Sequence, residues 1–95
     1  MGDNNNNIIL VGEKPFMNYV TGVVMQFTTL DSSEVIVKAR GKFIAKAVDI
    51  AEVARKRFLE NKIVVDKVVI NSEDFKNKEG KQIRVSTIEI FIKKE

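Results

Sequence analysis

The chain has 95 residues, which fits one domain with a single hydrophobic core. Apolar residues make up 44% and charged residues 31%, as in folded proteins and unlike disordered segments. The absence of cysteine and histidine excludes disulfides, thiolate catalysis and cysteine zinc sites, and removes the commonest general base. No apolar run approaches the roughly 20 residues of a membrane-spanning helix, and no signal peptide is recognisable. We therefore expect a soluble cytoplasmic protein.

The first two thirds of the chain predict alternating strands and helices. Residues 1–7 are polar and rich in asparagine, which predicts a disordered tail before a single domain at residues 8–95. Residues 8–11 form a short apolar run, typical of a buried strand. After Pro15, apolar side chains recur at spacings of three and four up to Phe27, which predicts an amphipathic helix.

A second strand and a second helix follow. Residues 34–39 form the strand, and Gly41 ends it. The helix runs from about residue 42 or 43 to residue 60, with a main apolar face made of Ile44, Ala47, Val48, Ala51, Ala54 and Phe58. Its apolar arc continues through Phe43 and Ile50 to Val53 and covers roughly 200°, whereas one buried face needs little more than 100°. A helix sunk deep in the core would explain this width, but we favour self-association through Phe43, Ile50 and Val53.

The last third of the chain predicts two strands, at residues 63–70 and 82–93, joined by a polar segment. In the last strand Ile83 and Val85 alternate in one phase, and Ile88 and the following isoleucines alternate in the other. Such a change requires a bulge or a change of environment. We therefore expect residues 71–86 to project from the body as a hairpin arm.

The predicted order is β-α-β-α-β-β, with parallel pairing in the first part and an antiparallel final pair. The predicted fold is thus an α/β (α+β) sandwich, in which two helices pack on a mixed four-stranded sheet.

Basic residues are concentrated between positions 38 and 57, where seven cations and two acids give a local charge of +5. Period-two alternation places Lys38 and Arg40 on one side of their strand, and Lys42 and Lys46 follow without an intervening acid. Lys14 occupies the equivalent junction after the first strand. Because the carboxyl ends of parallel strands meet at one edge of a sheet, we expect one surface for a polyanion. The alternative is a solvated helix start.

The hairpin arm adds further cations, mixed with acids. The basic residues are Lys76, Lys78, Lys81 and Arg84, and the acids are Glu73, Asp74 and Glu79. Few aromatic residues lie outside apolar faces, which favours contacts to a duplex backbone over stacking on single-stranded bases. Serine and threonine lack a base, carboxylates are scattered, and no glycine-rich phosphate loop occurs. We therefore expect no enzyme, no metal and no cofactor.

Several spaced motifs together resemble the Alba family of archaeal chromatin proteins. The run Lys-Ala-Arg-Gly-Lys at residues 38–42 and the run Ile-Ala-Lys-Ala-Val-Asp at residues 44–49 resemble the family's central motif. Residues 11–19 and 84–90 resemble its first junction and its last strand. The resemblance covers nearly everything from residue 8 to residue 94. It implies the fold of the C-terminal domain of translation initiation factor three, and a homodimer that binds double-stranded DNA, and often RNA, with little sequence preference.

The resemblance also implies roles for individual residues. Lys14, Arg40 and Lys42 would be contacts of the dimer's body, and Lys81 and Arg84 contacts of arms that reach toward the minor groove. Phe58 matches an aromatic position used between dimers along DNA. One position departs from the family pattern, because Glu13 stands where relatives often carry the first of two lysines, a proposed acetylation-controlled contact. A carboxylate repels phosphate, so we expect weaker DNA binding and no acetylation control there.

The leading hypothesis is therefore a dimeric architectural protein of chromatin, located on the nucleoid in the cytoplasm and able to assemble further on DNA. Its candidate nucleic-acid contacts are Lys14, Lys38, Arg40, Lys42, Lys46, Lys78, Lys81 and Arg84. The alternative is an RNA-binding subunit of a ribonucleoprotein such as RNase P, or an RNA chaperone. Two hypotheses from other classes are a protein-interaction scaffold that uses the wide apolar arc and a small metal-dependent hydrolase.

Overall fold

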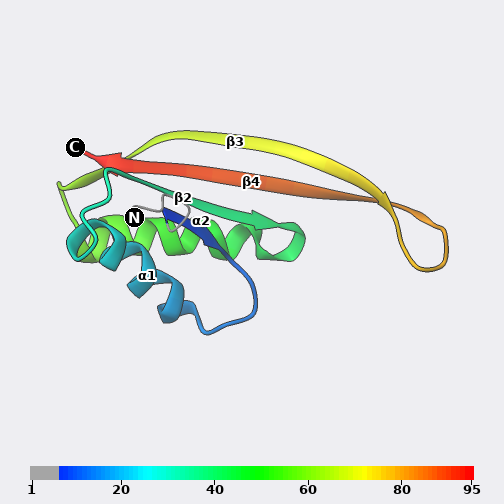
Figure 1. Cartoon of the computed structure of the whole chain (residues 1–95), viewed down its shortest axis with the longest axis horizontal. Coiled ribbons are helices and arrows are strands. Elements are labelled where there is room, and N and C mark those ends of the chain that lie inside the picture. The colour runs from blue at the N-terminus through cyan, green and yellow to red at the C-terminus, as the bar shows by residue number, and fades with distance from the viewer. Residues whose placement is uncertain (1–6) are drawn as a thin grey trace.

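A computed structural model describes residues 7–95, which form four strands and two helices (Figure 1). The elements are β1 (Ile8–Leu10), α1 (Phe16–Thr28), β2 (Glu34–Arg40), α2 (Ile44–Val53), β3 (Ile63–Lys76) and β4 (Gln82–Lys94). A 3₁₀ turn, Gly41–Phe43, precedes α2, and a π-helical turn, Ala54–Phe58, continues it. The predicted element order is confirmed. Residues 1–6 of the expected tail lie outside the described residues, whereas the side chain of Asn7 donates a hydrogen bond to the Glu34 carbonyl.

The sheet is mixed, as predicted, with strand order β1-β2-β4-β3. β1 runs parallel to β2, and β4 runs antiparallel to both of its neighbours, β2 and β3. Both helices pack on one face of this sheet (Figure 1). Alternate residues of β2 and β4 are buried beneath them, namely Val35, Val37, Ala39, Ile88, Ile90 and Ile92. Burial of each large aliphatic side chain stabilises the fold by about 1.5–3 kcal/mol. The opposite face, which carries Lys38 and Arg40, is called the open face below.

The expectation that residues 8–11 form a buried strand is wrong for half of its side chains. β1 has only three residues and lies at the edge of the sheet, with β2 as its one neighbour. Ile9 and Val11 face the core, but Leu10 is 70% exposed. An unbroken apolar run is typical of strands covered on both faces, yet no element covers this strand's outer face among the described residues.

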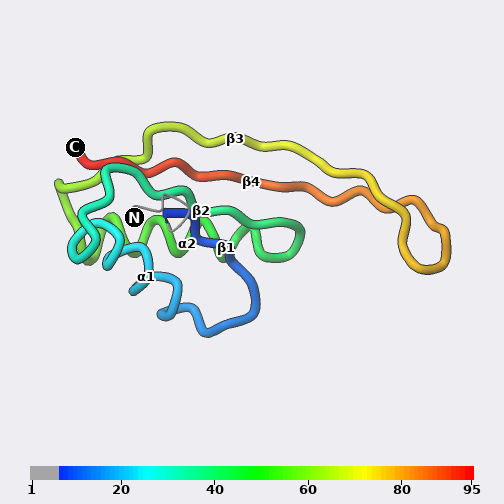
Figure 2. The backbone as a smooth tube through the Cα atoms, in the orientation of Figure 1, coloured from blue at the N-terminus to red at the C-terminus, as the bar shows by residue number. Residues whose placement is uncertain are grey.

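The hairpin arm forms where it was predicted (Figure 2). Arg40 and Thr87 are the last residues paired between β2 and β4, so β4 has only β3 as its neighbour before residue 87. The two strands continue in register to the pair Lys76 and Gln82, and the molecule reaches 46 Å along its longest axis. β4 has no bulge, so the change of phase reflects a change of environment: Ile88 faces the helices, and Val85 lies on the open face.

The buried face of α2 differs from the apolar face that the helical spacing predicted. Ile50, expected at an interface, is fully buried within the protomer and offers no surface to a second copy. Val48, assigned to the core, is 40% exposed. The Leu59 amide donates to the Ala54 carbonyl five residues earlier, and this π-helical turn puts Leu59 in the core and leaves Phe58 half exposed. An inserted π turn rotates the following residues, which regular helical spacing cannot anticipate.

An acid-sensitive ion pair lies near the end of α2. Arg55 donates hydrogen bonds to the Glu52 carboxylate, and this contact lowers the carboxyl pKa below its ordinary 4.5, although burial opposes the shift. A carboxyl with a lowered folded-state pKa stabilises the fold above its unfolded pKa, and this stabilisation is lost as pH falls through the folded value. Glu52→Gln should therefore slightly lower the unfolding free energy at neutral pH, and the difference should vanish in acid. Denaturant unfolding of the wild-type and variant proteins, from neutral to acidic pH, measures the difference in unfolding free energy. A difference that does not change with pH would contradict a stabilising ion pair between Glu52 and Arg55.

Candidate functional site

Two strand ends bring cations to one edge of the sheet. β2 ends with Lys38 and Arg40 on its open face, because Val37 and Ala39 take the alternate, buried positions. The following Gly41 has φ of +56°, a conformation that other residues adopt only with strain, and it starts the turn that carries Lys42. The loop after β1 runs beside this edge, since the Val11 amide donates to the Lys38 carbonyl. We call the group Lys14, Lys38, Arg40 and Lys42 the basic edge.

Three cations of the basic edge are paired with carboxylates of this chain. Lys38 pairs with Glu89 at 3.2 Å, Arg40 with Glu73 at 3.5 Å, and Lys42 with Glu13 at 3.8 Å. Exposed pairs of this kind contribute little to stability, typically below about 1 kcal/mol. A phosphate can therefore replace each carboxylate at small cost. The three carboxylates thus neutralise part of the positive charge of the basic edge, but they do not prevent an anion from binding there.

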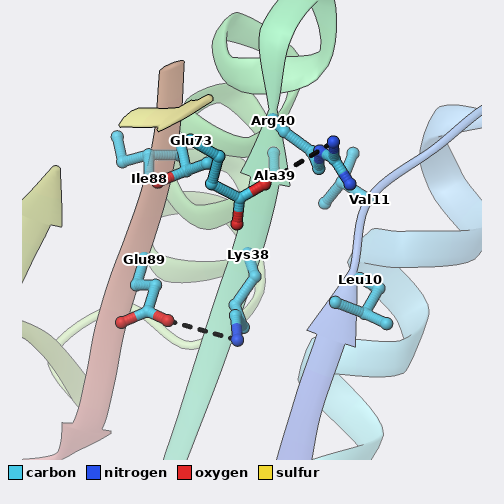
Figure 3. A pocket seen from close by; sticks show the side chains of 9 residues that line it. Leu10, Val11, Lys38, Ala39, Arg40, Glu73, Ile88 and Glu89 are labelled. Carbon is cyan, nitrogen blue, oxygen red and sulfur yellow. Dashed lines mark ion pairs between the residues drawn. The ribbon is translucent and has the colours of Figure 1, made fainter. Parts of the chain in front are cut away.

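Figure 3 shows two of these pairs beside a groove of about 380 Å³ on the open face. The groove lies between β1 and β4, with Lys38, Arg40, Glu73 and Glu89 on its sides. Apolar side chains, including Leu10 and Val11, also line it. Arg40 also lies 6.0 Å from the centre of the Phe75 ring on the arm. Arg40 thus connects the basic edge with the hairpin arm.

Lys46 differs from the other candidate contacts. Its ammonium donates hydrogen bonds to the carbonyls of Gly12 and Lys14, both at 2.7 Å. It also lies 5.1 Å from the centre of the Tyr19 ring. The structure therefore brings Lys46 to the basic edge but turns its charge toward the β1–α1 loop. The helical spacing placed Tyr19 only on the apolar face of the first helix, but its hydroxyl also accepts hydrogen bonds from the same loop.

The remaining candidate contacts, Lys78, Lys81 and Arg84, lie on the arm. Lys78 and Lys81 lie in the turn between β3 and β4, which the Asn77 side chain closes by accepting hydrogen bonds from the amides of Glu79 and Lys81. Arg84 donates to Asp74 at 3.0 Å across the arm. Within residues 7–95 neither Lys78 nor Lys81 has an ion pair. The tip is therefore free to take up anions, whereas Arg84 is partly neutralised.

A second exposed surface lies on the helix side of the sheet. A groove of about 500 Å³ separates α2 from β3, and it is lined by Val48, Ala51, Glu52, Arg55, Val64, Val65, Val68, Ile88 and Ile90. Val68 is 51% exposed, and Ile70, the next residue of β3 on this face, is 76% exposed. Of the expected interface residues, Phe58 is exposed, whereas Phe43 and Val53 are partly buried against the protomer's own core.

Other kinds of site find no support in the described part of the chain. Between residues 7 and 95, no three carboxylate side chains come close enough together to hold a metal ion. No helix within that range is long and apolar enough to cross a membrane.

The fold and the basic edge define a small α+β protein with a cationic surface and a long two-stranded arm. The chain belongs to the Alba family, whose model matches residues 7–72. It is 48% identical over 88 residues to the DNA/RNA-binding protein Alba of Methanocella arvoryzae, covering 93% of this chain and 90% of that one. It is 44% identical over 86 residues to the protein of the same name from Methanococcus maripaludis, covering 90% and 96%. Among solved structures, Alba from Thermoplasma volcanium is similar, with a TM-score of 0.82, 42% identity, and 90% and 98% coverage.

Proposed function

We propose that this chain is an architectural protein that binds double-stranded DNA, and also RNA, mainly through backbone phosphates. The observation that carries the proposal is the basic edge, where two strand ends and two loops present four cations beside a cationic arm. The names of the curated relatives, DNA/RNA-binding protein Alba, support it. The role is non-catalytic, and its place is the chromosome in the cytoplasm.

The proposed contacts divide between the body and the arm. Lys14, Lys38, Arg40 and Lys42 would neutralise phosphates beneath the body, and Lys78, Lys81 and Arg84 would follow the duplex along the arm. Phosphate contacts fix the position of a protein on a duplex but carry no sequence information. The acids at this surface would be displaced by phosphate, so the binding should be weaker than the number of cations suggests.

We further propose that the protein acts as a homodimer, formed through the groove between α2 and β3. The groove and the adjoining strand expose Val48, Val68 and Ile70 on one continuous apolar face. Contiguous apolar patches of this kind are uncommon on monomeric proteins. Glu52 and Arg55 on its rim supply opposite charges, which suits an interface with a second copy of the same face. Phe58, exposed at the end of α2, would remain available for contacts between dimers.

Val68→Lys should convert the dimer to a monomer, because a second copy would have to bury an unpaired ammonium. Val68 is half exposed in the protomer, so the fold should persist. The matched control is Val69→Lys, which adds the same charge on the other face of β3, opposite Glu89. Light scattering after size exclusion measures the mass. A Val68→Lys protein with the same mass as the control would exclude this face as the interface.

RNA is the second candidate partner, and the double designation of the curated relatives favours it. The basic edge suits both duplexes, because double-stranded RNA is also recognised through its backbone and shape. In this case the protein would serve as a subunit of a ribonucleoprotein or as an RNA chaperone.

The decisive experiment is a fluorescence-anisotropy titration of labelled duplex DNA at several salt concentrations, with structured RNA as competitor. Steep salt dependence and weak displacement by RNA would support a role in chromatin. On B-DNA, log K falls by about 0.9 per tenfold rise in salt concentration for each phosphate that the protein neutralises. Weak DNA binding with strong displacement by RNA would favour the ribonucleoprotein role. Absence of binding to either would refute the proposed function.

A further inference from the structure

The loop between β1 and α1 is held by four hydrogen bonds that come from two side chains. The Tyr19 hydroxyl accepts from the amides of Gly12 and Lys14, at 2.9 and 3.1 Å. The Lys46 ammonium donates to the carbonyls of the same two residues, both at 2.7 Å. Both residues therefore have their backbone groups satisfied. The amides donate to Tyr19 of α1, and the carbonyls accept from Lys46 of α2.

The position of the Lys46 ammonium does not suit a direct contact to phosphate. Lys46 is half-buried, and two of its three N–H donors are used by the loop carbonyls. The ammonium also faces two aromatic rings, at 5.1 Å from the centre of Tyr19 and 5.9 Å from that of Phe43. A phosphate could reach only the third N–H donor, unless it drew the ammonium away from both loop carbonyls. Lys42, by contrast, is highly exposed, and its one ion pair within residues 7–95 is with Glu13 of the loop.

The loop that Lys46 holds carries the residues that face a polyanion. Lys14 is exposed, and Glu13 reaches Lys42 at 3.8 Å. Because the backbone is fixed on both sides of Glu13, the side chains of residues 13 and 14 project from a defined position. Fixing a contact residue in its bound position reduces the entropy lost on binding.

We propose that Lys46 and Tyr19 are positioning residues, which form a clamp that holds Lys14 at the basic edge. This inference rests on the proposed nucleic-acid binding, and it replaces a direct phosphate contact by Lys46 with an indirect one through Lys14. Lys46→Met removes the ammonium but keeps most of the aliphatic length. Tyr19→Phe removes the hydroxyl from the other side of the loop and changes no charge.

The first test needs no nucleic acid. Hydrogen exchange in both variants should accelerate at the amides of Gly12 and Lys14, while the core amides of β2 and β4 exchange as in the wild-type protein. This outcome is readable even if the proposed function fails. Unchanged exchange at both loop amides would overturn the clamp. If Lys46→Met does not fold, Tyr19→Phe gives the same readout.

The second test is a double-mutant cycle in the affinity for duplex DNA. We expect Lys46→Met and Tyr19→Phe each to weaken binding several-fold in the wild-type background and by less than about twofold when Lys14 is already alanine. Lys42→Met is the matched comparison for a direct contact, and its effect should persist in the Lys14→Ala background. An equal loss from Lys46→Met in both backgrounds would overturn the positioning role and restore a direct contact.

Discussion

Arg40→Ala should weaken binding to every duplex by a similar factor, about tenfold or more at low salt. A hydrogen bond to a charged group is worth roughly 1.5–3 kcal/mol. Loss of one phosphate contact should also reduce the slope of log K against log salt concentration by about 0.9. Arg40 lies on the open face where β2 ends, between the loop after β1 and the start of the arm. It is therefore placed to join the contacts of the body to those of the arm. Anisotropy titrations at several salt concentrations give both the affinity and the slope.

The matched control for this variant is Arg57→Ala, which removes the same charge from an exposed position in the π-helical turn. It should change the affinity much less, because the effect depends on place and not on net charge alone. Arg40→Ala should leave thermal stability nearly unchanged, since its exposed pair with Glu73 contributes little. Retention of wild-type affinity and slope in Arg40→Ala would remove the basic edge from the proposed function.

Local patterns predicted the architecture well. Period-two and helical spacings gave the element order, and the change of phase after Val85 located the arm, because both are direct consequences of which side chains meet the core. The same alternation placed Lys38 and Arg40 on one face, and the shared direction of β1 and β2 brought their ends together. The spacing of side chains and the relative direction of the strands suffice to predict such features. These features depend only on neighbours along one strand or on the order of the strands in the sheet.

The features that the sequence could not predict depend on single tertiary contacts. The exposure of Leu10 follows from the edge position of β1, which its apolar run does not encode. Phe58 leaves the core because α2 continues as a π-helical turn, in which the Leu59 amide donates to the Ala54 carbonyl. Lys46 resembled its neighbours in a basic run, and only its contacts with a loop 32 and 34 residues earlier distinguish it from a surface cation.

Pairing of the binding cations with carboxylates of the same chain has a further consequence for affinity. Lys38, Arg40 and Lys42 each have an acidic partner from a different element. When a phosphate takes the place of that partner, the released carboxylate remains nearby and repels the duplex. The net gain from each cation is therefore smaller than for a lysine such as Lys78 at the tip of the arm, which has no ion pair among the residues that the structure describes. Substitutions of these acids should strengthen binding, and the largest gain should come where the acid can be exchanged for a cation.

Glu13→Lys should strengthen binding to duplex DNA by about tenfold at low salt. The substitution frees Lys42 from its partner at 3.8 Å and replaces a repulsive charge beside Lys14 with an attractive one. A change of two charge units at a distance of several ångströms is worth roughly 1–2 kcal/mol in partly aqueous surroundings. The gain should shrink as salt rises, because the Debye length falls to about 10 Å at 0.1 M.

Two further variants separate the causes of this gain. Glu13→Gln removes the repulsion and the ion pair without adding a cation, so it should give an intermediate affinity. Glu60→Lys makes the same change in net charge at an exposed position after the π-helical turn, away from the basic edge, and it should have a much smaller effect. An unchanged affinity for Glu13→Lys at low salt would show that the loop after β1 does not approach the phosphates, and the body contact would then have to lie elsewhere on the open face. Equal gains from Glu13→Lys and Glu60→Lys would show instead that net charge, and not the position of the loop, governs binding.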